Sequence, residues 1–236
     1  TLPWAGSLAA DEIRVAVASN FRATISALAE AFEEQTGHSV VLIPGSTGKL
    51  YAQIVHGAPF DLFFAADAER PSRLESEGDA LPRSRFTYAI GRLALWSAQP
   101  GLVDGSAQVL SDQGFRHLAL ANPQLAPYGR AARESLQKLG AWEELQDRLV
   151  TAENVGQAYQ FVHSGNAELG FVAWPQLLTS GAVETGSLWL VPGNLHLPIE
   201  QQAVALRDTP AVHAFLSFVR GDPGHEIIRS HGYSVP

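Results

Sequence analysis

The 236-residue sequence contains no cysteine and no methionine. Without cysteine the chain can form no disulfide, no thiolate metal site, no cysteine nucleophile and no lipid-anchored N-terminal cysteine. The missing methionine includes the initiator, which agrees with a processed or truncated chain. The sequence also lacks an apolar run long enough to cross a bilayer, so we expect no transmembrane span.

Positive charge is scarce, because 16 Lys and Arg residues stand against 24 Asp and Glu residues, for a formal net charge of −8. This balance argues against nucleic acid and against an anionic membrane surface as partners. Hydrophobic residues make up 46% of the chain and charged residues 17%, which is the composition of a globular protein. The length suffices for one large α/β domain or for two lobes of ordinary size.

The first residues look like the end of an export signal. Residues 4–10, WAGSLAA, are apolar or small, and two charged residues follow them. A signal peptide that has lost its basic start and is cleaved near Ala9 or Ala10 has this pattern. A disordered N-terminal extension would have it too. We therefore expect residues 1–10 to be a signal-peptide remnant or a disordered extension.

Strand-like runs alternate with helical patterns along the chain. The strand-like runs lie at 13–18, 40–43, 60–65, 86–90, 93–96, 117–121, 169–173, 188–191 and 202–206. The helical patterns lie at 21–32, 50–55, 128–139, 155–162, 211–219 and 225–230. Such alternation predicts a largely parallel sheet. Because no long linker or internal repeat divides the chain, we expect two α/β lobes between which the chain crosses twice, near 87–93 and near 198–204.

Four junctions between a predicted strand and the next helix carry the candidate functional residues. Ligands of open α/β sheets bind beyond the carboxyl ends of the strands. The first turn of a helix offers N–H groups without partners and a partial positive charge. Four such helix starts together predict a site for an anion. Its candidate residues are Ser19, Asn20, Ser46, Thr47, Tyr128 and Val155.

Each candidate also has a simpler interpretation. Ser, Thr or Asn before a helix, as at Ser46 or Asn154, is most often an N-cap. Tyr128 and Val155 belong to residue types that usually pack in a core, so only their backbone position makes them candidates. The anion site therefore depends on the four junctions lying together.

Motifs for catalysis or metal binding are missing. The segment 45–50, GSTGKL, resembles the end of a phosphate-binding loop, but the positions that require the first glycine and the final Ser or Thr differ. Ser46 does not lie in the GxSxG pattern of a nucleophile elbow. The eight histidines are scattered without HExxH-type pairing, so we expect no metal ligand, cofactor or catalytic residue. Asp61 and Asp67 flank one strand, and we interpret them as residues that bound and cap it rather than as an acid/base pair.

Seven segments of the chain, in order, resemble one known family. AVASNF at 16–21, GSTGKLYAQIVHGAPFDLFFAAD at 45–67, RFTYAIGRLALWS at 85–97 and NPQLAPYGRAA at 122–132 resemble the periplasmic molybdate-binding proteins of ABC transporters. KLGAWEEL, ENVGQAY and ELGFVAW fit the same family in the same order. The resemblance covers nearly the whole chain and implies an α/β, two-lobe periplasmic-binding-protein fold of type II. Its sheets are mixed and mostly parallel, with two crossovers between the lobes.

The resemblance further implies how the lobes and the site are arranged. Residues 11–89 and 200–236 form lobe 1, and residues 90–199 form lobe 2. A tetrahedral oxyanion is held by neutral groups and no side chain binds its metal atom. Those groups are Ser19 and Asn20 in one loop, Ser46 and Thr47 in a second loop, and the backbone N–H groups of Tyr128 and Val155 from the other lobe.

Two details qualify the resemblance. Some members of the family supply a tyrosine hydroxyl after the strand that is ELGFV here, whereas this chain has Ala173. The chain therefore resembles the members that use a Ser/Thr-Asn pair in the first loop instead. Lys49 and Arg130 lie close to two of the anion loops, and we expect both side chains to point away from the anion.

The implied function is to capture molybdate or tungstate in the periplasm and deliver it to an inner-membrane ABC permease, as a monomer that is not an enzyme. The residues separate neither molybdate from tungstate nor the contribution of Ser46 from that of Thr47. A receptor for another tetrahedral oxyanion, such as sulfate or phosphate, is the alternative. The effector domain of a transcription regulator is disfavoured, because a strand at Ile13 leaves no room for a helix-turn-helix. An enzyme is disfavoured as well, because no nucleophile is paired with a base.

Overall fold

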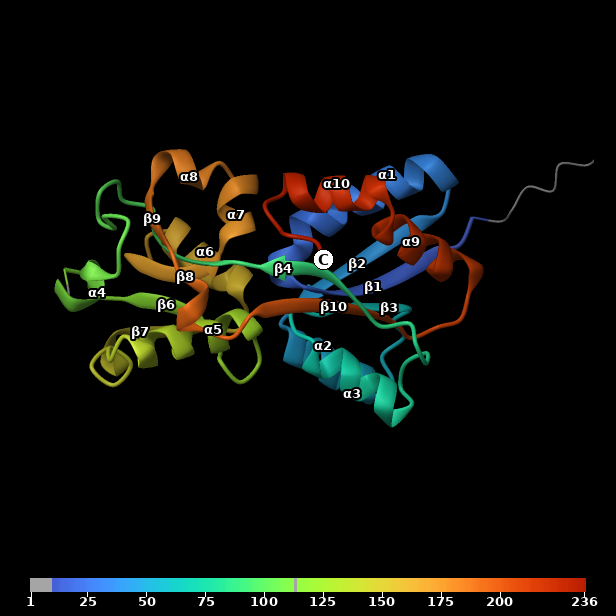
Figure 1. Ribbon diagram of the computed structural model, residues 1–236, viewed down its shortest axis with the longest axis horizontal. Helices are drawn as coiled ribbons and strands as arrows, with labels where there is room; N and C mark the ends of the chain where they lie inside the picture. The colour runs from blue at the N-terminus through green and yellow to red at the C-terminus, as the bar shows by residue number, and fades with distance from the viewer. Residues whose placement is uncertain (1–9, 113) are drawn as a thin grey trace, which may run out of the picture.

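The computed structural model describes residues 10–112 and 114–236, which form two lobes side by side (Figure 1). Each lobe is built on one five-stranded sheet with helices on both of its faces. The strand order is β2-β1-β3-β10-β4 in the first lobe and β7-β6-β8-β5-β9 in the second. The expected signal-peptide remnant lies, except for Ala10, outside the described residues.

The first lobe contains both ends of the described chain. Its strands are β1 (Glu12–Ala18), β2 (Ser39–Gly45), β3 (Leu62–Phe64), β4 (Phe86–Gly91) and β10 (Ile199–Ala205). A 3-10 turn, η1 (Ser19–Phe21), follows β1 directly. The helices are α1 (Arg22–Thr36), α2 (Thr47–Val55), α3 (Glu69–Glu77), α9 (Pro210–Arg220) and α10 (Asp222–Ser230).

The second lobe is made from the middle of the chain. Its strands are β5 (Leu93–Ser97), β6 (Leu118–Ala121), β7 (Leu149–Ala152), β8 (Leu169–Ala173) and β9 (Ser187–Leu190). Its helices are α4 (Gln108–Asp112), α5 (Pro127–Lys138), α6 (Val155–His163), α7 (Trp174–Thr179) and α8 (Ala182–Thr185), with the 3-10 turns η2 (Gln146–Arg148) and η3 (Gly193–Leu195). Among the described residues, no helix combines the length and the apolarity needed to span a membrane.

Four strands of each sheet run in one direction and the fifth runs against them. β1 is parallel to β2 and β3, and β6 is parallel to β7 and β8. β10 is antiparallel to β3 and β4, and β5 is antiparallel to β8 and β9. The fold is therefore the predicted α/β fold of two lobes with mixed, mostly parallel sheets.

The chain crosses between the lobes twice. β4 ends at Gly91 and β5 begins at Leu93, so a single residue connects the two sheets. Residues 191–198 lead back from β9 to β10. The reversed strands, β5 and β10, are the ones that follow these crossings, because each enters its sheet from the other lobe. The lobe boundaries expected at 89/90 and 199/200 stay a prediction.

Apolar side chains fill both faces of each sheet. In the first lobe the rings of Phe21, Phe64, Tyr88 and Phe215 pack together under α1 and α9, with 4.5 Å between the centroids of Phe21 and Tyr88. Residues of α2 and α3 pack on the opposite face. Each buried ring of this kind contributes roughly 1.5–3 kcal/mol. Each lobe thus has its own core, and the strand ends that face the other lobe are held rigidly.

Candidate functional site

A small cavity lies between the two lobes, where β1, β2, β6 and β7 end. Its space, counted together with the open solvent at its mouth, is about 180 Å³. All six residues predicted from the four junctions line it. The lining residues are Ala18, Ser19, Asn20, Gly45, Ser46, Thr47, Ala66, Ala126, Pro127, Tyr128, Asn154 and Val155. Segments more than one hundred residues apart in the chain therefore meet at one point.

The junction between β2 and α2 places two hydroxyl groups at the cavity. Ser46 precedes α2 in extended geometry (φ −73°, ψ 145°), but its side chain makes no capping hydrogen bond. Its Oγ is buried and has no hydrogen-bond partner among the described residues. Thr47 Oγ1 accepts a hydrogen bond from the N–H of Ala66 (3.1 Å), which leaves the hydroxyl proton available for a ligand. Ser46 is thus no ordinary N-cap.

Asn154, by contrast, is the N-cap that its residue type suggests. Its Oδ1 accepts a hydrogen bond from the N–H of Gln157 at 3.0 Å, in the first turn of α6. Because the cap bonds the N–H of Gln157, the N–H of Val155 stays at the start of α6, at the positive end of the helix dipole. The cap therefore fixes the helix start that faces the cavity.

In the second lobe α5 brings its own first turn to the cavity. Pro127 occupies the first position of α5 and has no N–H, so the first N–H that this helix presents is that of Tyr128. Gly129 allows the close packing that places this turn, because a Cβ there would lie 2.1 Å from the carbonyl oxygen of Ala121 at the end of β6. Burial raises the pKa of Tyr128 well above its usual range, so its hydroxyl stays neutral.

Asn20 contributes to the site differently from what its residue type suggests. Its Nδ2 donates to Gln201 Oε1 at 2.7 Å and to Tyr233 Oη at 3.0 Å, both inside the first lobe. The Tyr233 hydroxyl in turn donates to the backbone carbonyl of Asn20 at 2.8 Å. The side-chain amide is thus committed to the protein, and the turn η1 is held in place by it.

The two lobes touch on both sides of the cavity. The N–H of Gly48 donates to the carbonyl oxygen of Leu125 at 2.8 Å, and the N–H of Gly156 donates to Ser19 Oγ at 3.3 Å. Each bond joins a residue of the first lobe to one of the second. The structure therefore has the lobes closed around the cavity.

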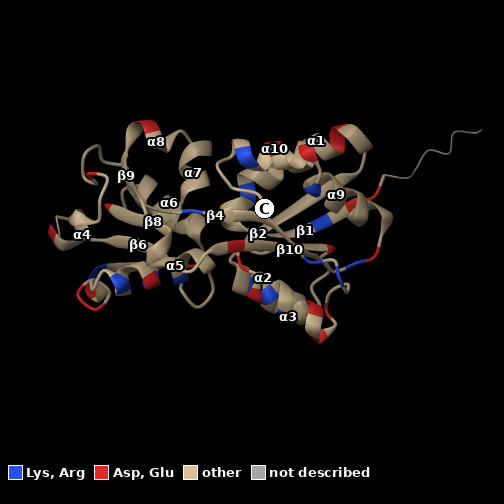
Figure 2. Cartoon of the chain, viewed as in Figure 1, with Lys and Arg blue, Asp and Glu red and all other residues tan. Residues whose placement is uncertain are grey.

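Neither Lys49 nor Arg130 is among the residues that line the cavity, and each forms an ion pair across the two lobes. Lys49 Nζ lies 3.1 Å from Glu153 Oε2, and Arg130 Nη1 lies 3.4 Å from Glu69 Oε2. Both pairs are exposed and both join one lobe to the other. Charged residues of both signs are spread over the helices and loops of the two lobes (Figure 2). Among the described residues that line the cavity, none carries a formal charge at neutral pH.

The carboxylates that flank β3 have the structural roles predicted for them. Asp61 Oδ2 accepts from the N–H of Arg14 at 2.7 Å, beside the start of the strand. Asp67 Oδ1 accepts from the N–H of Arg70 at 3.1 Å in the first turn of α3, and its other oxygen pairs with the Arg70 guanidinium. Within 10–112 and 114–236, no group of three His, Cys, Asp or Glu side chains is placed to hold a metal ion.

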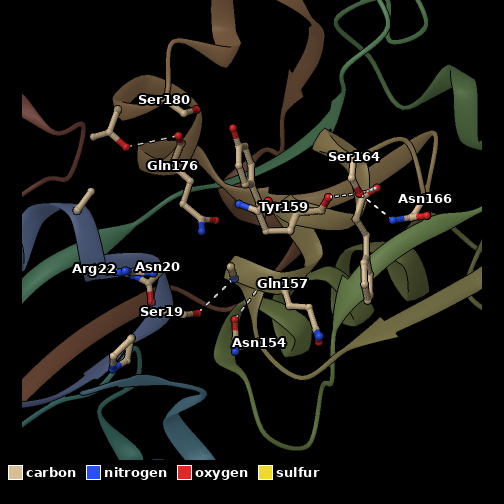
Figure 3. A pocket seen from close by; sticks show the side chains of 16 residues that line it. Ser19, Asn20, Arg22, Asn154, Gln157, Tyr159, Ser164, Asn166, Gln176 and Ser180 are labelled. Carbon is tan, nitrogen blue, oxygen red and sulfur yellow. Dashed lines mark hydrogen bonds between the residues drawn. The ribbon is translucent and has the colours of Figure 1, made fainter. Parts of the chain in front are cut away.

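A wider groove opens beside the cavity and shares Ser19, Asn20 and Asn154 with it; its space, counted together with the open solvent at its mouth, is about 1430 Å³. Figure 3 shows Ser19 reaching from the first lobe toward α6, with amide and hydroxyl side chains of α6 and α7 around the groove. Residue type alone did not single this groove out, because its lining consists of common surface residues. The bond from Gly156 to Ser19 lies between the groove and the cavity.

The sequence as a whole matches a known family. A family model described as bacterial extracellular solute-binding protein matches residues 13–234. The chain belongs to this family.

Two known proteins and one solved structure are similar to the chain over nearly its full length. The molybdate-binding protein ModA of Azotobacter vinelandii is 48% identical over 229 residues, which are 96% of this chain and 91% of the relative. ModA of Rhodobacter capsulatus is 46% identical over 228 residues, which are 95% of this chain and 89% of the relative. The solved structure of the Azotobacter vinelandii periplasmic molybdate-binding protein has a TM-score of 0.91 at 47% identity, covering 95% of this chain and 99% of that one.

Proposed function

We propose that the protein captures molybdate or tungstate as a tetrahedral dianion in the cavity between its lobes. The observation that carries this proposal is the buried hydroxyl of Ser46, which faces a small cavity and has no partner among the described residues. A buried polar group without a partner is costly, and a ligand oxygen would satisfy it. The two relatives that are 46–48% identical, both called molybdate-binding proteins, support the choice of anion.

The proposed ligand contacts are all neutral donors. They are the hydroxyl groups of Ser19, Ser46 and Thr47 and the backbone N–H groups of Asn20, Tyr128 and Val155. Fixed N–H and O–H dipoles at helix starts stabilise an anion strongly where water is excluded. Because the dipoles are held by the fold, little reorganisation is required when the anion binds. A dianion can therefore be held without a positively charged side chain.

Selectivity follows from the size of the cavity and from its donors. Sulfate is smaller than molybdate, so it would make longer and weaker hydrogen bonds in a cavity that fits molybdate. Phosphate carries a proton near neutral pH and requires an acceptor. Thr47 Oγ1 and Asn154 Oδ1 already accept hydrogen bonds from the protein. Donor-rich walls thus favour a fully deprotonated anion.

We further propose that the protein works in the periplasm as a monomer and passes the anion to an inner-membrane ABC permease. Ligand contacts from both lobes stabilise the closed form by the difference in affinity between closed and open states. The permease would recognise that closed form. We propose no catalytic role and no cofactor, since the cavity residues that the structure describes include neither a carboxylate nor a histidine.

Separate titrations of four anions test the proposal. Molybdate, tungstate, sulfate and phosphate are titrated separately into the purified protein by calorimetry, and the melting temperature is measured with each. We expect molybdate and tungstate to bind and to raise the melting temperature, with sulfate and phosphate far weaker. Tight binding of sulfate or phosphate instead would support the alternative receptor, and no response to molybdate and tungstate at saturating concentration would overturn the assignment.

A pair of variants locates the site. Thr47→Ala removes a hydroxyl that we propose contacts the anion, and we expect molybdate affinity to fall about tenfold. Thr36→Ala is the control. It removes a hydroxyl at the end of α1 that donates to the carbonyl of Phe32, accepts from the N–H of His38 and does not line the cavity, so affinity should not change. Equal affinities of the two variants would move the contact away from Thr47.

A further inference from the structure

A cluster of buried polar side chains lies behind the cavity, where the chain crosses between the lobes. It consists of Asn20, Tyr88, Tyr128, Gln201 and Tyr233, and we refer to it as the crossover cluster. Each of these side chains is at least 96% buried. Buried polar groups are costly unless they are paired, so such a cluster requires a particular arrangement of its members.

Gln201 is the centre of this cluster. It is fully buried in β10, the strand that follows the second crossing, and the register of β10 against β4 shifts between Gln201 and Gln202. Gln201 Oε1 accepts from Asn20 Nδ2 at 2.7 Å and from Tyr88 Oη at 3.2 Å. Through Asn20, Gln201 therefore holds the turn η1 that carries the first anion loop.

The other end of the same amide lies beside the second lobe. At Gly91, the last residue of β4, an added Cβ would lie 2.3 Å from Tyr128 Oη and 2.9 Å from Gln201 Nε2. The Tyr128 ring of α5 and the Gln201 amide of β10 thus converge on one residue of the first crossing. Tyr128 is also the residue whose backbone N–H we propose as a ligand donor.

We propose that Gln201 is a positioning residue that sets the relative placement of the anion donors from the two lobes. The inference deepens the proposed function and rests on it. Gln201 touches no ligand, because it is not among the residues that line the cavity. One end of its amide accepts a hydrogen bond from the Asn20 side chain, and the other end lies against Gly91 at the first crossing, beside Tyr128. Donors from both lobes are thereby fixed at the spacing of one small anion.

The neighbouring residue provides a matched control. Gln202 is the same amino acid, is 7% exposed and also lies at the register shift in β10. Its amide bonds a different set of side chains, namely Arg85, Thr87 and Glu200. Replacing Gln202 therefore removes a comparable set of hydrogen bonds from the same strand without touching the crossover cluster.

The test compares Gln201→Leu with Gln202→Leu and with Tyr233→Phe, which removes only the hydroxyl that bonds Asn20. Molybdate affinity and the melting temperature without ligand are measured for each variant and for the parent. We expect about tenfold weaker binding for Gln201→Leu, a smaller loss for Tyr233→Phe and parent-like binding for Gln202→Leu. The double variant Gln201→Leu/Tyr233→Phe should lose less affinity than the two single losses combined, because both act through Asn20.

The outcomes separate this inference from the proposed function. If the parent binds neither molybdate nor tungstate, the proposed function fails and the inference fails with it. If the parent binds molybdate and the affinities of Gln201→Leu and Gln202→Leu are equal, only the positioning role is overturned. If Gln201→Leu does not fold, the affinity of Tyr233→Phe decides. Parent-like molybdate affinity of Tyr233→Phe would then overturn the positioning role of the crossover cluster.

Discussion

Lys49 Nζ lies 3.1 Å from Glu153 Oε2, and the two residues belong to different lobes. Lys49 lies in the first turns of α2, directly after the second anion loop, and Glu153 lies just before α6. Lys49 therefore joins the two lobes and is not among the residues that line the cavity. An ion pair of this kind exists only when the cleft is closed.

Reversing the charge of Lys49 should oppose closure. In Lys49→Glu two carboxylates face each other in the closed form, so we expect molybdate affinity to fall several-fold, in line with exposed pairs worth about 0.2–1 kcal/mol. Added salt should reduce the loss, because these groups are exposed to solvent. Arg73→Glu is the control, because it changes the net charge of the protein by the same amount, whereas Arg73 pairs with Glu77 inside α3 and not across the cleft. A loss of the same size in both variants would mean that net charge, not the pair across the cleft, sets the affinity.

The Ser46 hydroxyl is buried and has no hydrogen-bond partner in the part of the chain that the structure describes, so affinity and stability should change in opposite directions when it is removed. In Ser46→Ala a buried polar atom without a partner is removed, so the melting temperature of the ligand-free protein should stay equal or rise. Molybdate affinity should fall about tenfold, because a hydrogen bond to the anion is lost. Calorimetry and thermal unfolding measure the two quantities on the same sample. A lower ligand-free melting temperature with unchanged affinity would show that Ser46 is a structural residue.

The sequence predicted the helix starts of the site well, because their positions depend on local patterns. Small polar residues predicted a helix start near Ser46 and Thr47, where α2 begins at Thr47, and apolar spacing predicted a helix at 155–162, where α6 spans Val155–His163. The meeting of these starts at one cavity followed only from the strand order of an α/β fold. The family resemblance supplied the rest, including two lobes.

The sequence could not predict what depends on long-range packing. The α3 helix was missed because only Pro71 and Leu74 of its nine residues are buried, which leaves no apolar stripe. The role of Asn20 was also out of reach, because its partners Gln201 and Tyr233 are about 180 and 210 residues away along the chain. Neither partner carries a local signal of function.

Gly129 should be one of the least replaceable residues of the second lobe. In Gly129→Ala the new Cβ would lie 2.1 Å from the carbonyl oxygen of Ala121, so the start of α5 must move away from β6. We expect a loss of about 1–3 kcal/mol in the free energy of unfolding, as for overpacked sites, together with weaker molybdate binding. Gly193→Ala is the control, because no described residue lies within 4 Å of a Cβ there. Parent-like stability and affinity of Gly129→Ala would show that the start of α5 does not have to approach β6 so closely.

The stability of the second lobe should depend on pH through Glu168. Burial by itself would raise the pKa of Glu168, but the N–H groups of Arg116 and His117 and the Arg116 guanidinium outweigh it and lower the pKa to about 2. A carboxylate whose folded pKa is lowered contributes stability above its unfolded pKa, near 4.3, and loses it as the pH falls toward 2.

Glu168→Gln should therefore cost about 1–2 kcal/mol in the free energy of unfolding at pH 7, with less effect as the pH falls below about 4.3. Urea unfolding of parent and variant between pH 7 and pH 3 measures the difference. Replacing the exposed Glu30 by Gln should leave the free energy of unfolding unchanged across this range. A difference for Glu168→Gln that stays constant down to pH 3 would mean that the carboxylate charge adds nothing beyond its hydrogen bonds, because Gln retains an acceptor oxygen but no charge.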